Sequence, residues 1–538
     1  MVVFAAIFVL PIARSFQRLA CDTHRETILR DWVRIMERSP WEDRGFPRFR
    51  RDFQDLFARH LGFRRELVEA NAKATIALFG ESPSTRVVIG EDGWLFASRP
   101  GFMDDFRGLR PFSSSELDLR VAALESRRDY LARKGIPYLF VIAPNKHLVY
   151  PDKVPAKFNR VRTATQTDAL LKALRESNPD FEVLDLLDSQ HAARDEAICY
   201  YPLDTHWNYF GAYHAYLAIM AKLERSLPGI QTLSPNRIRM QPDKDQWRGM
   251  MDTMGILGPL EPVAEMQRYV VVNPTVSYPS TLPPDLPALE GSRYGLRAPT
   301  TYRILRSPGD KPRALLFRDS FSMALLPLLS EHFSVLVALW EDFDQGLLEE
   351  AVEKYQPDIV IEERLDRFLA LSPQFTPDIS RRLFGEAFEK AEPMPKSAVI
   401  REKRTSSLKS QLINRGTHLA VVDHRKARVH SPEVLLEPGM GAVLKLSVWS
   451  PTGGLSQIGS RVRGKESGSE TQQTEKFWMP GGESDLFFTI PNVTERSKVR
   501  FQFRPFRKGD MVLRRMELRQ TAEPMPTLAP DRSTTHLQ

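Results

Sequence analysis

Short apolar runs alternate with longer amphipathic segments through the middle of the chain. Each run has the length and composition of a buried strand, and the segments between the runs repeat apolar residues at helical spacing. The predicted strands are residues 138–143, 181–187, 314–317, 333–339 and 358–361, and the predicted helices are residues 116–134, 163–176, 209–219 and 347–355. This alternation predicts an α/β sandwich with a largely parallel sheet. A proline-rich stretch at residues 228–299 interrupts it and is long enough to hold a lid or substrate loops.

The pattern changes beyond Glu392. A charged segment that contains proline and serine predicts a linker at residues 391–415. Short β-rich runs punctuated by glycine, proline, serine and asparagine then predict a β-sandwich at residues 416–520. Trp449, Trp478 and Arg504 make this sandwich a candidate carbohydrate-binding domain, although tryptophans also fill sandwich cores. The tail at residues 521–538 is rich in proline and threonine, which predicts disorder.

The chain starts with an uncharged apolar run from Val2 to Ala13. This run is shorter than the roughly 20 residues of a membrane-spanning helix, and it lacks the basic start of a secretory signal. We interpret residues 1–20 as a candidate membrane anchor or a truncated signal, with a buried core helix as the alternative.

Composition excludes several classes of protein. The chain has 538 residues, of which 42% are hydrophobic, so it can form more than one domain. Its 75 Lys and Arg residues against 68 Asp and Glu residues give a net charge of only +7, which is too small for the length to indicate a nucleic-acid partner. Zinc-ligand spacing and a phosphate-binding glycine loop are both missing from the sequence. We therefore expect no nucleic acid, metal or cofactor.

Two cysteines, Cys21 and Cys199, exclude a disulfide framework but leave one bridge open. Cys199 stands between Ile198 and Tyr200, which predicts a small buried residue instead of a reactive thiol.

Ser320 is the predicted nucleophile. It follows a buried strand and precedes a segment with helical apolar spacing, so it falls on a strand-to-helix turn. Such a turn exposes the hydroxyl at the carboxyl edge of a sheet and directs helix N-terminal amides toward a developing oxyanion. Ser322, one step further into the helix, is the weaker candidate.

A serine nucleophile needs an imidazole to accept its proton and a carboxylate to orient that imidazole. Asp204 and His206 are two positions apart, a spacing that lets both side chains point into one cleft. The same pattern in Asp22-Thr23-His24 lacks the strand and turn context and is interpreted as incidental. Asp-Thr is also an ordinary helix cap, which is the structural alternative for Asp204.

Four short strings extend this pattern into a family resemblance. In chain order they are Gly90 to Phe96, Ala143 to Lys146 followed by Tyr150-Pro151, Asp204 to Trp207, and Asp319 to Ser322. Together they resemble the alginate O-acetyltransferase family, whose members are SGNH-hydrolase-like proteins with the triad rearranged along the chain. The resemblance covers about residues 46–371 and implies an SGNH-hydrolase-like three-layer sandwich at residues 46–390. It also implies that Ser320 carries the acetyl group, that His206 is the base and that Asp204 orients it.

The resemblance further implies a function. The chain is expected to transfer acetyl groups onto hydroxyls of an exported cell-surface polysaccharide through an acetyl-serine intermediate. The expected donor is a membrane-bound O-acyltransferase, and the expected location is the periplasm, with the N-terminus tethered to the inner membrane. Two alternatives stay open: a carbohydrate acetyl esterase that uses the same triad, and a non-catalytic polysaccharide-binding scaffold.

Four polar residues near strand ends are candidates for substrate or oxyanion contacts: Asn145, Lys146, Arg318 and Arg364. Asn145 is a candidate oxyanion donor, and Lys146 or Arg364 a candidate partner for a sugar carboxylate. Arg318 stands where the family motif usually has glycine, and it either contacts an anionic sugar or points to solvent. Each is also readily explained as a solvated loop residue. Trp94 and Trp207 either stack on a sugar ring or pack in the core.

Overall fold

The computed structural model describes residues 64–98, 102–244, 247–256, 265–277, 289, 302–341, 343–394, 433–450, 453–504 and 511–525, with short strand segments between residues 401 and 430. The candidate anchor at residues 1–20, Cys21 and the predicted tail beyond residue 525 lie outside the described residues. Within the described part of the chain, every helix is too short or too polar to cross a membrane.

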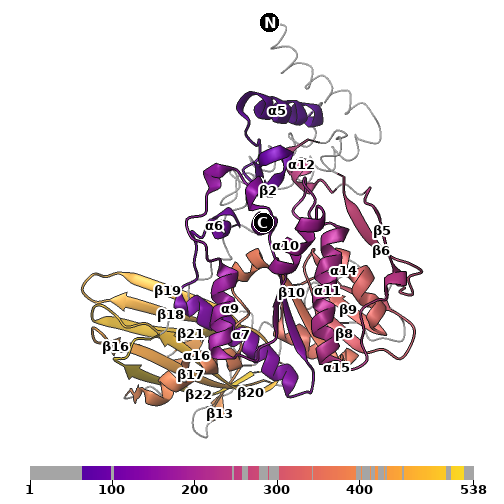
Figure 1. Ribbon diagram of the computed structural model, residues 1–538. Helices are drawn as coiled ribbons and strands as arrows, with labels where there is room; N and C mark the ends of the chain where they lie inside the picture. Colours follow the sequence, from indigo (N-terminus) through magenta and orange to yellow (C-terminus); the bar gives the residue numbers. More distant parts are fainter. Residues whose placement is uncertain are drawn as a thin grey trace, which may run out of the picture.

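A six-stranded sheet forms the centre of the larger domain (Figure 1). Its strands are β3 (Tyr138–Ala143), β4 (Val183–Asp185), β7 (Tyr302–Arg306), β8 (Arg313–Phe317), β9 (Val335–Leu339) and β10 (Ile359–Leu365). The order is β4-β3-β10-β8-β9-β7, and all neighbours are parallel except β7 and β9. The predicted α/β class with a largely parallel sheet is therefore confirmed. The antiparallel edge strand β7 was not predicted from the sequence.

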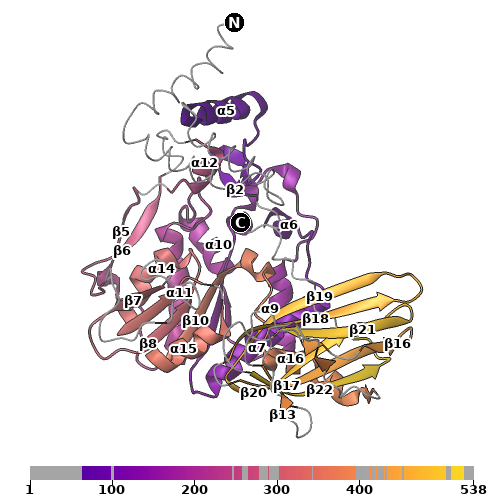
Figure 2. The same cartoon turned by 180° about the vertical axis from the view of Figure 1, so that it is seen from behind.

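Successive side chains along each strand point to opposite faces of the sheet, so the domain has one core on each face. Val141 and Leu316 pack on one face with the helices α10 (Leu187–Glu196), α11 (Tyr209–Ser226) and α14 (Ser322–Leu329). Phe140 and Leu315 pack on the other face with α7 (Ser114–Ala132), α9 (Gln166–Ser177) and α15 (Gln345–Tyr355). Because helices cover both faces, the domain has three layers, as Figures 1 and 2 show.

A small cap covers the carboxyl edge of the central sheet. It contains α5 (Arg64–Phe79), the hairpin of β1 (Val87–Ile89) and β2 (Leu95–Ala97), and α12 (Gly249–Met254). Ala72, Leu95 and Met251 share its apolar cluster with Leu203, which lies next to Asp204. Nearby are α6 (Phe102–Phe106) and α8 (Lys146–Val149), and the hairpin of β5 (Ile238–Pro242) and β6 (Gln267–Val271) flanks α11. The proline-rich stretch predicted to hold loops thus supplies α12 and this hairpin.

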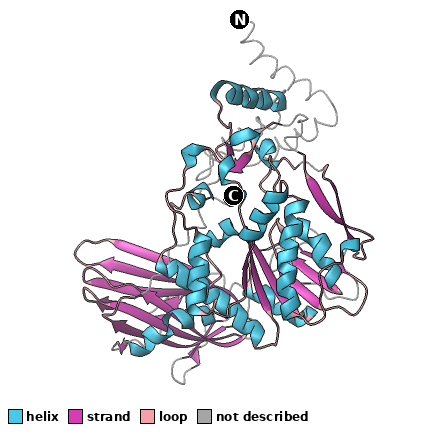
Figure 3. Cartoon of the chain, viewed as in Figure 1, coloured by secondary structure: helices cyan, strands magenta, loops and turns pink. Residues whose placement is uncertain are grey.

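The C-terminal part is built from antiparallel strands in two sheets (Figure 3). One sheet contains β11 (Glu392–Pro393), β13 (Leu412–Ile413), β14 (His418–Val421), β17 (Gly441–Ser450), β20 (Gly482–Ile490) and β22 (Met511–Thr521), and the other contains β12 (Arg401–Glu402), β15 (Val429–His430), β16 (Val434–Leu436), β18 (Gly454–Gly464), β19 (Glu470–Met479) and β21 (Ser497–Arg504). Leu446 from the first sheet and Phe501 from the second belong to one buried core. The predicted β-sandwich is therefore confirmed.

The sandwich core continues into the α/β domain. Leu119 on α7 and Phe384 on α16 (Pro377–Lys390) belong to the same buried cluster as the sandwich residues, and Phe375 forms a β-bridge with Phe477. Trp478 is buried, Trp449 is half-buried, and the side chain of Arg504 lies outside the described residues. The carbohydrate-binding role of the sandwich stays a prediction.

We predict that Phe477→Ala lowers the free energy of unfolding by about 3–5 kcal/mol, because this fully buried ring belongs to the core that the two domains share and its removal leaves a cavity. Denaturant unfolding followed by tryptophan fluorescence should show the shift in one cooperative transition. A loss below about 1 kcal/mol would contradict the shared core.

Candidate active site

The turn after β8 holds Ser320 by means of its neighbour Asp319. The Asp319 Oδ1 accepts a hydrogen bond from Phe321 N at 2.8 Å, which closes the turn. The Oδ2 of the same carboxylate accepts one from Leu365 N at 2.7 Å, which ties the turn to the carboxyl end of β10. Ser320 itself is half-exposed, at the predicted position between strand and helix.

His206 lies between the two groups predicted to act with it. Its Nε2 is 2.7 Å from Ser320 Oγ, and its Nδ1 is 2.5 Å from Asp204 Oδ1. Asp204 Oδ1 also accepts from the His206 backbone N at 3.1 Å. With the Nδ1 proton directed at Asp204, Nε2 is the acceptor for the serine proton. The structure therefore brings the three side chains together in the geometry that serine acyl transfer needs, and their catalytic roles stay predictions.

Asp204 is held in its ionised form. Burial alone would raise the pKa of this carboxyl, but the hydrogen bonds from His206 and from the Gly249 backbone N, which lies 2.9 Å from Oδ2, lower the pKa to about 2. Both carboxylate oxygens thus have donors, which orient the carboxylate and favour its ionised form. Gly249 opens α12 and was not recognised from the sequence.

The segment that carries Asp204 and His206 is fixed on both sides. Tyr200 and Trp207 form an isolated β-bridge, and Asn208 caps α11 by accepting from Phe210 N and Gly211 N. The indole Nε1 of Trp207 donates to Phe321 O at 2.9 Å, which joins this segment to the turn of the nucleophile. Trp94 and Trp207 are both buried, so they pack in the core and do not stack on sugar.

Lys146 corrects one prediction from the sequence. Its side chain is only 2% exposed, and Nζ donates to the carbonyls of Tyr201, Pro202 and Asp204 at 3.1, 3.0 and 2.6 Å. These three bonds use every donor of an ammonium group, so Lys146 is neither a solvated loop residue nor a ligand for a sugar carboxylate. Burial lowers its pKa well below the ordinary value. Its position shows that it clamps the backbone that carries Asp204.

Arg318 corrects a second prediction. It neither points to solvent nor contacts a sugar, because it is 1% exposed and its guanidinium lies 4.7 Å from the centre of the Trp340 ring. Its backbone N donates to Leu339 O, so residue 318 continues β8 and turns its side chain under Trp340. Burial lowers its pKa to about 10.

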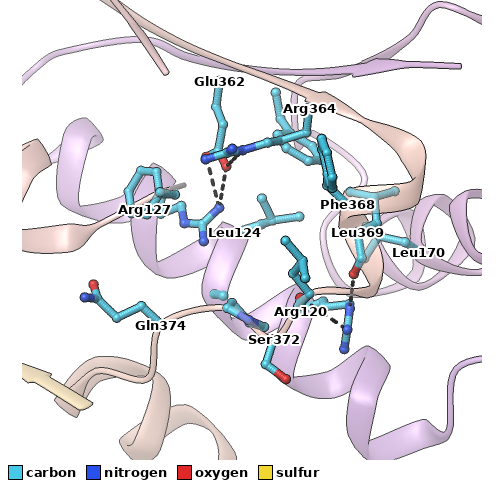
Figure 4. A pocket seen from close by; sticks show the side chains of 15 residues that line it. Arg120, Leu124, Arg127, Leu170, Glu362, Arg364, Phe368, Leu369, Ser372 and Gln374 are labelled. Carbon is cyan, nitrogen blue, oxygen red and sulfur yellow. Dashed lines mark hydrogen bonds and ion pairs between the residues drawn. The ribbon is translucent and has the colours of Figure 1, made fainter. Parts of the chain in front are cut away.

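Arg364 lies in a separate cavity of about 110 Å³ (Figure 4). Its guanidinium pairs with Glu362. The two carboxylate oxygens of Glu362 also accept hydrogen bonds from Arg127 NH1, at 3.0 and 2.9 Å. Among the described residues that line this cavity, none belongs to the triad. Arg364 is also buried, so the interpretation as a solvated loop residue is wrong.

Asn145 lies two residues after the end of β3 and precedes α8, on the same edge of the sheet as Ser320. Its backbone N donates to Asp366 Oδ2 at 2.9 Å, and its Oδ1 accepts from Arg367 at 3.1 Å. Because Arg367 donates to Oδ1, the Nδ2 group is the part of the amide that can act as a donor. Asn145 therefore stays a candidate donor to the oxyanion.

Ser322 is not an alternative nucleophile, because it is fully buried and its Oγ donates to Glu363 Oε2 at 2.7 Å. The same oxygen accepts from Asp319 N at 3.2 Å. Burial raises the pKa of Glu363 to about 8, and the nearby Asp319 contributes to the rise. Glu363 thus holds the residues on both sides of Ser320, a role that the sequence did not indicate.

Aromatic rings enclose the imidazole of His206. Phe321 lies 4.9 Å from it and Trp247 5.3 Å, between ring centres. Trp247 was missed because it stands in the proline-rich stretch without a recognisable motif.

Cys199 is fully buried and its thiol pKa is raised to about 12 by burial, so it is a core residue, as predicted. Within the described ranges, His, Cys, Asp and Glu side chains form no group of three or more that could hold a metal ion.

Part of the chain matches a known protein family. A family model described as the SGNH hydrolase-like domain of the acetyltransferase AlgX matches residues 87–280. The resemblance expected from the sequence is thus confirmed for this segment, which matches the model of an SGNH hydrolase-like acetyltransferase domain. The matched segment contains Asp204 and His206, and Ser320 lies beyond it.

Several solved structures are similar to the chain. Bacillus cereus PatB1 is 14% identical, with 53% of this chain and 96% of that chain covered and a TM-score of 0.38. The O-acetyltransferase domain of Pseudomonas putida AlgJ is 19% identical (55% and 98% covered, TM-score 0.36), and Pseudomonas aeruginosa AlgX is 16% identical (84% and 98% covered, TM-score 0.37). The curated proteins contain no match to this sequence.

We predict that Gly249→Ala lowers kcat by about 10²-fold, because an added Cβ would lie 2.6 Å from Asp204 Oδ2 and displace the carboxylate that orients His206. Ester hydrolysis rates and thermal unfolding should be measured together. Gly385→Ala in α16 is the matched control, since its nearest contact is an ordinary 3.4 Å and alanine suits a helix. Unchanged turnover in Gly249→Ala would contradict the proposed support of Asp204.

Glu363→Gln tests the protonation of the buried acid. Because the folded pKa is raised, the stabilising contribution of Glu363 is complete below its ordinary pKa of 4.5 and is lost as the pH rises through about 8. We predict that the free energy of unfolding of the wild type falls more than that of Glu363→Gln between about pH 5 and pH 9. Parallel curves from chemical denaturation would contradict this prediction.

Proposed function

We propose that the protein transfers acetyl groups to hydroxyls of an exported cell-surface polysaccharide. The proposal starts from the match of residues 87–280 to an acetyltransferase domain. The observation that carries the proposal is the pair of contacts of His206, 2.7 Å to Ser320 Oγ and 2.5 Å to Asp204 Oδ1. A neutral imidazole held in this way can accept a proton from the serine hydroxyl, and the ionised Asp204 stabilises the imidazolium that results.

In the first half-reaction, Ser320 Oγ attacks the acetyl carbonyl of the donor while its proton moves to His206 Nε2. The tetrahedral intermediate collapses when the bond between the carbonyl carbon and the leaving oxygen breaks, and His206 returns the proton to that oxygen. The product is an acetyl ester on Ser320.

In the second half-reaction, a sugar hydroxyl takes the place of the leaving group. His206 Nε2 accepts its proton, the sugar oxygen bonds to the acetyl carbon, and the bond to Ser320 Oγ breaks. The proton then passes from His206 to Ser320, which restores the enzyme.

Two donors support the oxyanion in both steps. The backbone N–H of Ser320 has no hydrogen-bond partner among the described residues, and it stands in the turn before α14. Asn145 Nδ2, in the turn between β3 and α8, is the second proposed donor. Both are dipoles held by the fold before the reaction, which is the arrangement that stabilises a developing negative charge.

The match to the acetyltransferase family also suggests where the reaction takes place and which molecules take part in it. Family membership supports a periplasmic location and a polysaccharide acceptor, and a membrane-bound O-acyltransferase is the proposed acetyl donor.

We predict that Ser320→Ala lowers the release of 4-nitrophenol from 4-nitrophenyl acetate by at least about 10⁴-fold without a loss of folded structure. Stopped-flow absorbance and circular dichroism measure the two properties. Ser322→Ala should lose far less, since it retains the nucleophile and loses one bond to Glu363. Comparable turnover in Ser320→Ala and the wild type would refute every function that relies on this serine.

A further inference from the structure

Trp247 forms a half-buried aromatic wall beside the proposed base. Its indole meets the imidazole of His206 edge to face, with an interplanar angle of 75°. Gly249, two positions further along the chain, donates to Asp204 through its backbone N, so the segment that carries Trp247 is fixed to the triad. Trp94 and Trp207 are buried, whereas Trp247 is partly open to solvent at the site.

Tyr201 fixes the orientation of this indole. The two rings are stacked, with centres 5.5 Å apart and an interplanar angle of 4°. The Tyr201 hydroxyl donates to Asp243 Oδ2 at 3.1 Å, and the Asp243 side chain is fully buried at the end of β5. A packed indole with a fixed plane loses little conformational entropy when it binds a ligand.

We propose that Trp247 is the platform on which a pyranose ring of the acceptor lies, next to His206. This inference rests on the proposed acetyl transfer and extends it, because it assigns the choice between transfer and hydrolysis to one residue. The C–H groups of a pyranose carry partial positive charge and pack against the negative face of an aromatic ring. A sugar held there places its hydroxyl within reach of His206 and occupies the space that a hydrolytic water would need.

The competition with water makes such a platform necessary. Water at about 55 M exceeds a millimolar sugar by more than about 10⁴-fold, so transfer occurs only if binding raises the effective concentration of the sugar hydroxyl. Asp204, His206 and Ser320 are common to both reactions and cannot make this choice. Phe321, which also contacts the imidazole, is buried and offers no face to a ligand.

The test is a partition assay on the full chain with 4-nitrophenyl acetate as donor and two probe acceptors, a neutral β-1,4-glucan oligosaccharide and a polymannuronate oligosaccharide. Released 4-nitrophenol reports acylation of the enzyme, and mass spectrometry of the sugar reports transfer. We predict that Trp247→Ala lowers the ratio of transfer to hydrolysis at least about tenfold with at least one probe, while total 4-nitrophenol release stays within about tenfold of the wild type.

Trp247→Phe keeps an aromatic face and should retain most of the ratio of transfer to hydrolysis. This second variant keeps the test decisive if Trp247→Ala fails to fold. Phe79→Ala, which removes an exposed aromatic ring at the end of α5, is the control and should leave the ratio unchanged. If the wild type acetylates a probe and Trp247→Ala keeps the same ratio, the platform is refuted and the proposed function stands. If the wild type releases 4-nitrophenol and acetylates neither probe, both proposals fail in favour of an esterase.

Discussion

The contact between His206 Nε2 and Ser320 Oγ is the constraint on which the site depends, because it joins residues 114 positions apart in the chain. Neither segment could hold this contact alone. The bond from Trp207 to Phe321 O ties the two segments directly, and Asp319 fastens the turn of the nucleophile to β10. Lys146 fixes the backbone of the other segment through three carbonyls. A fold with short parallel strands can bring these elements to one edge because the carboxyl ends of its strands meet there.

Several of these supports are buried ionisable groups, which proteins rarely keep inside for stability alone. Lys146 and Glu363 both have pKa values displaced by burial toward the neutral form, Lys146 downward and Glu363 upward. Their polar atoms contact the residues that flank Asp204 and Ser320. Burying these groups costs desolvation free energy, and the hydrogen bonds that they form hold the segments of the site in place. Asp204 differs, because the hydrogen bonds that it accepts keep it ionised despite its burial. The pKa values of two carboxyl groups in one site are thus shifted in opposite directions by their different environments.

The strand periodicity, the turn at Ser320 and the pair Asp204 and His206 could be predicted from the sequence, because each depends on residues close together in the chain. The roles of Lys146 and Arg318 could not be, since a long basic side chain after a strand looks solvated until the segments that cover it are known. For Arg318 the cover is Trp340, at the end of another strand. Gly249 and Trp247 could not be predicted either, because they contact Asp204 and His206 only in the folded structure. The stretch that contains them has no regular sequence pattern.

The most direct measurement of the central claim is the chemical identity of the acylated residue. The enzyme would be mixed briefly with 4-nitrophenyl acetate without an acceptor, quenched in acid, digested and sequenced by tandem mass spectrometry. The account predicts one acetyl group, on Ser320, which appears and decays with the burst of 4-nitrophenol and does not accumulate in His206→Ala. An acetyl group on another residue that turns over at the catalytic rate, or turnover in the wild type with no acylated Ser320 at any time, would contradict it.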